Sequence, residues 1–205
     1  MTVTAPATAF GALREFARPR PAVDRCELCA AELGPAHEHL LDPGARQLRC
    51  SCVACGRLLC GTPGAPWKLV RHRVERLPHL RLTDEEWRML ALPIELAFFV
   101  RSSAAGRVMA LYPSAGGTIE SSLPLPAWDA LVGANPLLAD LQPDVEALLV
   151  NRTGRRRDHY LVSIDECYQL TGLMRLRWQG FGGGEEVWAE IGRFFADLDA
   201  RSGAP

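Results

Sequence analysis

The sequence predicts an α+β protein: a small N-terminal zinc-ribbon-like module, followed by a domain with an antiparallel sheet packed by helices. Two observations lead to this prediction. Six of the seven cysteines lie between residues 24 and 66, and the sequence from residue 67 onward alternates paired strand-like segments with helical ones. We therefore divide the chain into a flexible arm at 1–22, a four-cysteine metal module at 23–66 and an α+β domain at 67–201.

The N-terminal arm ends in the stretch Pro19-Arg20-Pro21, and a short amphipathic helix is compatible with residues 10–16. It lacks the apolar core of a secretory signal. The most apolar stretch of the chain, at 92–100, is interrupted by Pro93 and Glu95, so we expect no membrane insertion. These features predict a cytoplasmic protein, in which the cysteines are more consistent with metal ligation than with disulfides.

The module contains few residues that could build an apolar core, so another interaction must stabilise it. Two Cys-x-x-Cys pairs, Cys26 with Cys29 and Cys52 with Cys55, are separated by 22 residues. Each pair can form a tight knuckle, and four thiolates suit one tetrahedral ion. Gly56 directly follows the second pair and offers the backbone freedom that a knuckle turn often uses. We predict a zinc site made of these four cysteines.

Four further residues of the module are alternative metal ligands: Cys50, Cys60, His37 and His39. In the simplest interpretation Cys50 and Cys60 are small buried side chains and His39 is hydrogen-bonded within the module. In a second, Cys50 or His39 replaces one knuckle cysteine. In a third, six cysteines hold a binuclear or iron–sulfur centre.

Iron is the alternative to zinc, because a tetrahedral four-thiolate site suits both metals. Rubredoxin-like domains hold iron between two such knuckles. The segment lacks the aromatic packing expected around a shielded redox centre, and Trp67 is its nearest aromatic residue on the C-terminal side. This favours zinc.

The α+β domain is predicted as helices alternating with paired strands. Thr83-Asp84-Glu85-Glu86 is a capping box that opens a helix. Pro126 suits the first turn of a second helix, and Asp165 suits the N-cap of a third. The predicted elements are, in order, a helix at 84–91, strands at 94–101, 107–112 and 118–123, a helix at 126–132, strands at 145–151 and 159–164, and helices at 166–178 and 186–199.

Other chemically suggestive patterns in this domain have simpler explanations. The acidic residues at 84–86 suit the first turn of a helix, and Cys167 suits the core face of one. The basic stretch with Arg152 and residues 155–157 fits a solvated hairpin turn better than an anion site. The glycine-rich loop at 180–184 follows a helix, which argues against a phosphate cradle. We therefore expect no catalytic residues, and the net charge of −1 argues against nucleic acid as the partner.

Several motifs resemble one known family. They are Cys26-Glu27-Leu28-Cys29, His37-Glu38-His39-Leu40-Leu41-Asp42, Cys50-Ser51-Cys52-Val53-Ala54-Cys55, Leu92-Pro93-Ile94-Glu95-Leu96-Ala97-Phe98-Phe99, Tyr112-Pro113, Pro143-Asp144-Val145-Glu146-Ala147-Leu148-Leu149 and Ile164-Asp165-Glu166-Cys167-Tyr168. Together they resemble an uncharacterised actinobacterial family encoded beside NiFe-hydrogenase genes. The resemblance spans residues 24–200, and Cys60 does not belong to its pattern.

The resemblance implies an association with NiFe hydrogenase but no biochemical mechanism. In that setting we expect a non-catalytic accessory or assembly factor that binds a hydrogenase subunit or a maturation protein. One alternative is a rubredoxin-like redox accessory that passes electrons through iron. Another is a zinc-ribbon regulator that contacts nucleic acid through the basic turn at 152–157.

Overall fold

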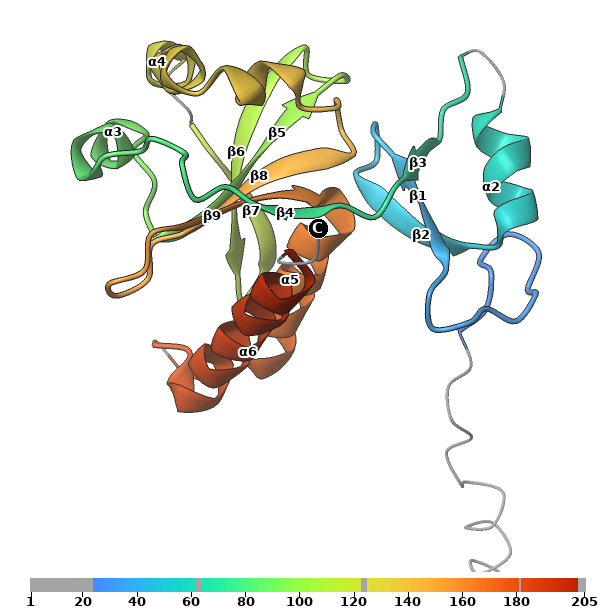
Figure 1. Cartoon of the computed structure of the whole chain (residues 1–205). Coiled ribbons are helices and arrows are strands. Elements are labelled where there is room, and N and C mark those ends of the chain that lie inside the picture. Colours follow the sequence, from blue (N-terminus) through green and yellow to red (C-terminus); the bar gives the residue numbers. More distant parts are fainter. Residues whose placement is uncertain (1–23, 62–63, 123–124, 181, 203–205) are drawn as a thin grey trace, which may run out of the picture.

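The computed structural model describes residues 24–61, 64–122, 125–180 and 182–202, which form a small N-terminal module beside a larger α+β domain (Figure 1). The predicted arm and the predicted helix at 10–16 lie outside the described residues. The predicted α+β class and antiparallel pairing are confirmed. Among the described helices, none is both long and apolar enough to cross a membrane.

The module is built on a three-stranded antiparallel sheet with the order β2-β1-β3. Strand β1 (Glu38–Asp42) pairs with β2 (Gln47–Ser51) on one side and with β3 (Lys68–Val70) on the other. Helix α2 (Val53–Cys60) follows β2 directly. The module sheet therefore extends to Val70, four residues beyond the boundary expected from the sequence.

The larger domain contains a six-stranded antiparallel sheet with the order β4-β9-β8-β5-β6-β7. Its strands are β4 (Val74–Arg76), β5 (Leu96–Ser102), β6 (Arg107–Ser114), β7 (Gly117–Ser121), β8 (Glu146–Asn151) and β9 (Asp158–Ser163). Its helices are α3 (Asp84–Met89), α4 (Leu125–Ala134), the 3-10 helix η1 (Pro136–Asp140), α5 (Ile164–Arg177) and α6 (Gly184–Ser202).

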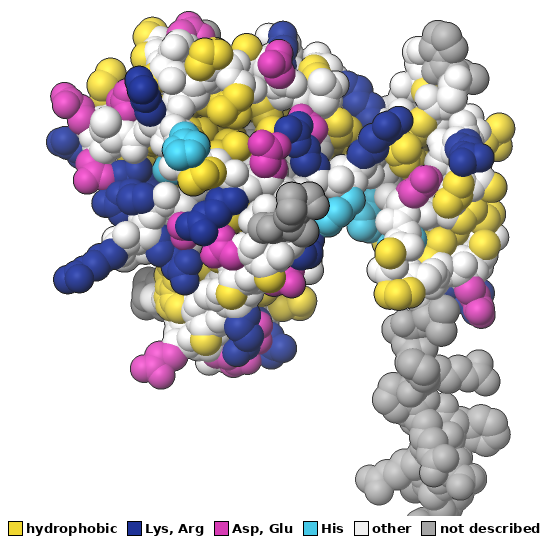
Figure 2. All heavy atoms as spheres, in the orientation of Figure 1, with side chains coloured by type: hydrophobic (Ala, Val, Ile, Leu, Met, Phe, Trp, Pro, Cys, Tyr) yellow, Lys and Arg dark blue, Asp and Glu magenta, His cyan; other side chains and the backbone are white. Residues whose placement is uncertain are grey.

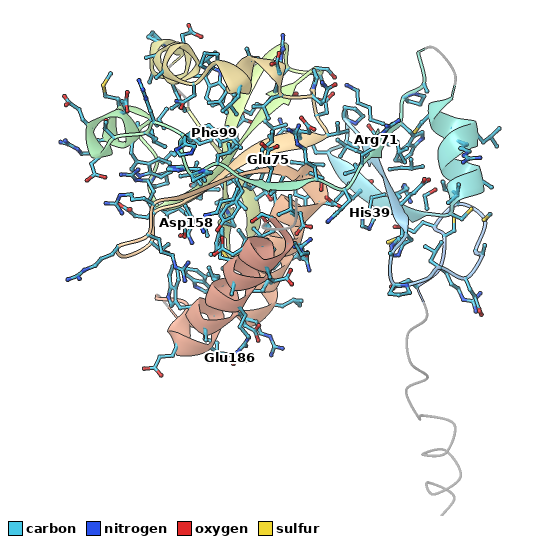
Figure 3. All side chains as sticks on the ribbon, viewed as in Figure 1. His39, Arg71, Glu75, Phe99, Asp158 and Glu186 are labelled. Atoms are coloured by element: carbon cyan, nitrogen blue, oxygen red, sulfur yellow. The ribbon has the colours of Figure 1, made fainter. Side chains whose placement is uncertain are left out.

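Helices cover both faces of this sheet (Figure 1). Neighbouring residues of a strand point to opposite faces, so β5 contributes to two cores. Phe98 belongs to the cluster formed with α5 and α6. Phe99, which Figure 3 labels, belongs to the cluster formed with α3, α4 and η1, where its ring stacks on Trp128 at 5.3 Å between centroids. Cys167 is fully buried in the first cluster, as predicted.

The local signals of the sequence account for most of the larger domain. The predicted capping box of α3 is present, with Thr83 Oγ1 accepting from the Glu86 amide and the Glu86 carboxylate accepting from the Thr83 amide. Two short strands, β3 and β4, were not predicted, because three residues are too few for a recognisable alternation. The predicted N-cap at Asp165 is wrong: α5 begins at Ile164 after Ser163.

The module and the larger domain contact each other through both apolar and charged side chains. Leu41 and Val70 of the module are buried in the cluster shared with α5 and α6. Lys68 of β3 forms an ion pair with the buried Asp144 at 2.5 Å, and His39 of β1 bonds to Asp165 of α5 at 2.9 Å. These contacts join residues that are far apart in the sequence.

Candidate metal centre

The first cysteine pair lies in a tight turn that precedes the module sheet. The Ala30 amide donates to the Cys26 carbonyl at 2.8 Å, and the Cys26 amide donates to the Ala31 carbonyl at 2.8 Å. Ala30 has a φ of 60°, in the left-handed region that a turn of this kind requires. The backbone therefore folds back on itself and turns Cys26 and Cys29 toward the same point, as expected for a knuckle.

The second pair lies at the N-terminus of α2, which the sequence analysis did not foresee. Cys52 is the N-cap residue, and its Sγ accepts from the Cys55 amide at 3.5 Å. A helix N-terminus stabilises negative charge, so this position favours thiolates.

Gly56 lies in helical backbone, so it does not supply special backbone freedom, and a larger residue there would require the end of the Glu38 side chain to move. This glycine is a buried helical residue, and a Cβ atom there would collide with the Glu38 carboxylate. This corrects the reason that the sequence analysis gave for a glycine after the second pair.

The four cysteines converge. Their Sγ atoms all lie within 4.8 Å of one another, and those of Cys29 and Cys52 are 3.7 Å apart. Cys26 is buried, Cys29 is exposed, and Cys52 and Cys55 are half-buried. Four sulfurs gathered from two knuckles match the donor set of a tetrahedral thiolate site. The residues present therefore fit a metal ion, and the same donor set suits zinc and iron.

The thiols of this group affect each other's protonation. Backbone amides, first that of Cys52, lower the pKa of Cys26 to about 6. The neighbouring side chains of Cys29 and Cys52 raise the pKa of Cys55 to about 12. Four negative sulfurs at this spacing repel one another unless a cation lies between them. A bound metal ion would supply that charge and release the remaining protons.

Three of the alternative ligands form a second group, separate from the four cysteines. The ligand atoms of His37, His39 and Cys50 lie within 4.8 Å of one another, and all three residues are half-buried. His39 donates from Nδ1 to the Asp165 carboxylate at 2.9 Å, and this hydrogen bond raises the pKa of His39. Cys60 belongs to neither group and lies at the last position of α2.

A cavity of about 1140 Å³ adjoins this second group, between the module sheet and the start of α5. Figure 2 shows histidine side chains at the junction of the two bodies, and Figure 3 labels His39 there. Arg71, His72, Glu166 and Tyr168 also line the cavity. His37, His39 and Cys50 are ligand candidates by residue type, but the sequence does not show that their ligand atoms lie close together.

The basic stretch after β8 differs from its prediction at one residue. Arg152 is not at a solvated turn: it is 1% exposed, donates to the Leu82 carbonyl at 3.0 Å and pairs with Asp84. Its guanidinium lies 5.5 Å from the ring centroid of Trp87. Arg156 and Arg157 are exposed and pair with carboxylates of Asp158 and Asp84. Arg152 is thus buried, in contrast to the other arginines of this turn.

The structure thus combines a small module, whose four clustered cysteines could bind a metal ion, with an α+β domain. Residues 25–202 match the family of unknown function DUF5947, and the chain belongs to this family. The match confirms a family without an assigned function and spans nearly the same residues as the motifs; the expected hydrogenase setting stays a prediction. No curated protein and no solved structure matches the chain.

Proposed function

We propose that the protein is a zinc-stabilised, non-catalytic accessory factor that acts in the cytoplasm by binding a subunit or a maturation protein of a NiFe hydrogenase. The observation that carries the structural part is the convergence of Cys26, Cys29, Cys52 and Cys55 within 4.8 Å. Four protein thiolates fill the coordination of a tetrahedral zinc ion and leave no position for water or substrate. Such a site stabilises a fold instead of performing chemistry.

The surface of the module supports a protein partner. Leu58 and Val53 on α2 are 74% and 51% exposed, and Leu28 in the first knuckle is 38% exposed. Figure 2 shows hydrophobic side chains gathered on the side of the module where Figure 1 places α2. Exposed apolar side chains grouped on a small rigid module are typical of a surface that another protein covers.

The charges argue against nucleic acid as the partner. Arg152 is buried, and the exposed Arg156 and Arg157 are paired with carboxylates. Binding to phosphates draws on a basic surface with unpaired charge, and the chain has a net charge of −1. In the basic turn at 152–157 this leaves Arg155 as the exposed arginine outside these ion pairs, which weakens the support for a nucleic-acid-binding regulator.

The hydrogenase setting rests on the resemblance described above and is tested in the host. Deleting the gene should lower hydrogenase activity while transcripts of the structural genes stay at their normal level. Affinity purification of the tagged protein should recover a hydrogenase subunit or maturation protein. Loss of the transcripts, together with salt-sensitive DNA retardation by the protein, would identify a regulator instead. If the deletion leaves hydrogenase activity unchanged and no hydrogenase protein co-purifies, the proposed association with a NiFe hydrogenase is refuted.

The contact surface has its own test. Leu58→Asp should abolish co-purification of the partner, because it replaces the most exposed apolar side chain of α2 by a charged one. Leu176→Asp is the matched control, since Leu176 is 83% exposed on α5, away from the module. Equal loss in both variants, or none in Leu58→Asp, would show that α2 does not bind the partner.

A further inference from the structure

The pairing of β1 with β2 brings three metal-ligand side chains together. His39 and Cys50 are direct partners in this ladder, so their side chains lie on the same face of the sheet. His37 lies directly before β1, and its ligand atom is within 4.8 Å of those of His39 and Cys50. The His37 and His39 rings meet edge to face, with centroids 4.9 Å apart. Two imidazoles and one thiol therefore converge at the edge of the cavity.

Hydrogen bonds orient both imidazoles for metal binding. Nδ1 of His37 donates to the Gly34 carbonyl at 3.0 Å, and Nδ1 of His39 donates to the Asp165 carboxylate at 2.9 Å. Because these acceptors carry no proton, each ring donates from Nδ1, which leaves Nε2 as the nitrogen available to a metal ion. Metal-binding histidines are typically held in this way by a carbonyl or carboxylate.

One of these two nitrogens, Nε2 of His37, is buried and has no hydrogen-bond partner among the described residues. A buried polar atom without a partner costs free energy, so such atoms call for a ligand. A metal ion shared with His39 and Cys50 would satisfy this nitrogen.

We propose that His37, His39 and Cys50 form a second metal site, which binds a divalent transition-metal ion of the zinc class reversibly and leaves one coordination position open. Three protein ligands of nitrogen and sulfur type suit such ions. The fourth position faces the cavity of about 1140 Å³ and takes water in the isolated protein. This site goes beyond the proposed function, which requires only the closed four-cysteine site.

The second site also links metal binding to the contact between the two bodies. Asp165 belongs to α5 of the larger domain, while the three ligands belong to the module. Asp165 is thus a positioning residue that holds the His39 ring from across the junction. In Figure 3 the labelled His39 lies on the side of the module that faces the larger domain.

The test uses cobalt(II) as a coloured probe of the second site. The full-length protein is first treated with a mild chelator, which we expect to leave one zinc in the four-cysteine site, and is then titrated with cobalt(II). Wild type should bind one cobalt per chain with a thiolate-to-metal absorption band. Cys50→Ser and His37→Asn should lose this cobalt and keep the zinc. The matched controls Cys60→Ser and His79→Ala change residues outside both groups and should keep both metals.

Asp165→Asn tests whether Asp165 orients the His39 ring for metal binding. It should weaken cobalt binding by about 10–100-fold while zinc is retained, as for other groups that orient a metal-binding histidine. The retained zinc and an unchanged circular dichroism spectrum show that each variant is folded.

Several outcomes would overturn the second site. One is that wild type is saturated by one zinc and binds no cobalt, and another is that Cys50→Ser binds cobalt as wild type does. Loss of the zinc in both Cys50→Ser and His37→Asn would place these residues in the first centre. None of these results depends on the hydrogenase partner, so the second site can be refuted without refuting the partner proposal, and the reverse.

Discussion

Replacing Cys52 by serine should unfold the module while the larger domain stays folded. Within the described part of residues 24–70, the buried apolar side chains are Cys26, Leu40, Leu41 and Val70. The three aliphatic ones contribute about 2 kcal/mol each, or about 6 kcal/mol together. A structural zinc site contributes about 10–16 kcal/mol at neutral pH. If the loss of one thiolate prevents zinc binding, the module loses more stabilising free energy than its buried aliphatic side chains contribute.

The larger domain should survive because it has its own cores. Its own residues, among them Phe98 and Phe99, form nearly all of the two clusters, and the module adds the buried Leu41 and Val70 to the first. Hydrogen exchange resolved by segment, together with the metal content, measures both effects. Cys52→Ser should lose zinc and amide protection across 38–60, while the strands β5, β8 and β9 keep theirs. The same result is expected for Cys26, Cys29 and Cys55.

Cys60→Ser is the matched control for this experiment. Cys60 is half-buried on the same helix and belongs to neither ligand group, so its substitution should cost less than about 1 kcal/mol. Retained zinc and protection in Cys52→Ser would refute the four-cysteine site. Equal and complete metal loss in serine variants of all six module cysteines would instead indicate a shared cluster.

Two further predictions concern the larger domain. Burial lowers the pKa of His159 to about 4, so protonation opposes folding and stability should fall as the pH drops below about 6.5. Denaturant titrations should show that wild type loses about 2 kcal/mol more than His159→Gln between about pH 7 and pH 5; equal losses would contradict this. Arg152→Ala should cost about 3 kcal/mol in thermal or denaturant unfolding, because it leaves the Leu82 carbonyl without its donor. Arg155→Ala, at an exposed position, should change stability little, and equal effects would contradict the buried role of Arg152.

Local signals made much of the fold predictable. The capping box before α3, the hairpin of β8 and β9 and the two Cys-x-x-Cys pairs depend on residues close in sequence. The contact of His39 with Asp165 joins residues 126 positions apart. The residues next to Asp165 in the sequence do not show whether it caps a helix or bonds to a distant histidine. Helix capping is the more common role, so it was the one predicted.

The second ligand group was hidden for a related reason. His37, His39 and Cys50 were candidates by residue type, but their meeting depends on the register of β1 with β2. A shift by one residue would turn Cys50 to the other face. The burial of Arg152 likewise depends on Trp87 and Asp84, which lie on a different element.

We infer that four thiolates hold one zinc ion in the module. X-ray absorption at the zinc edge, measured on Cys50→Ser protein purified without added metal, tests it most directly because this variant should retain only the first site. We expect one zinc per chain with four sulfur neighbours at about 2.3 Å and no nitrogen or oxygen neighbour. A nitrogen or oxygen in the coordination shell, or stable iron with visible absorption in place of zinc, would contradict it.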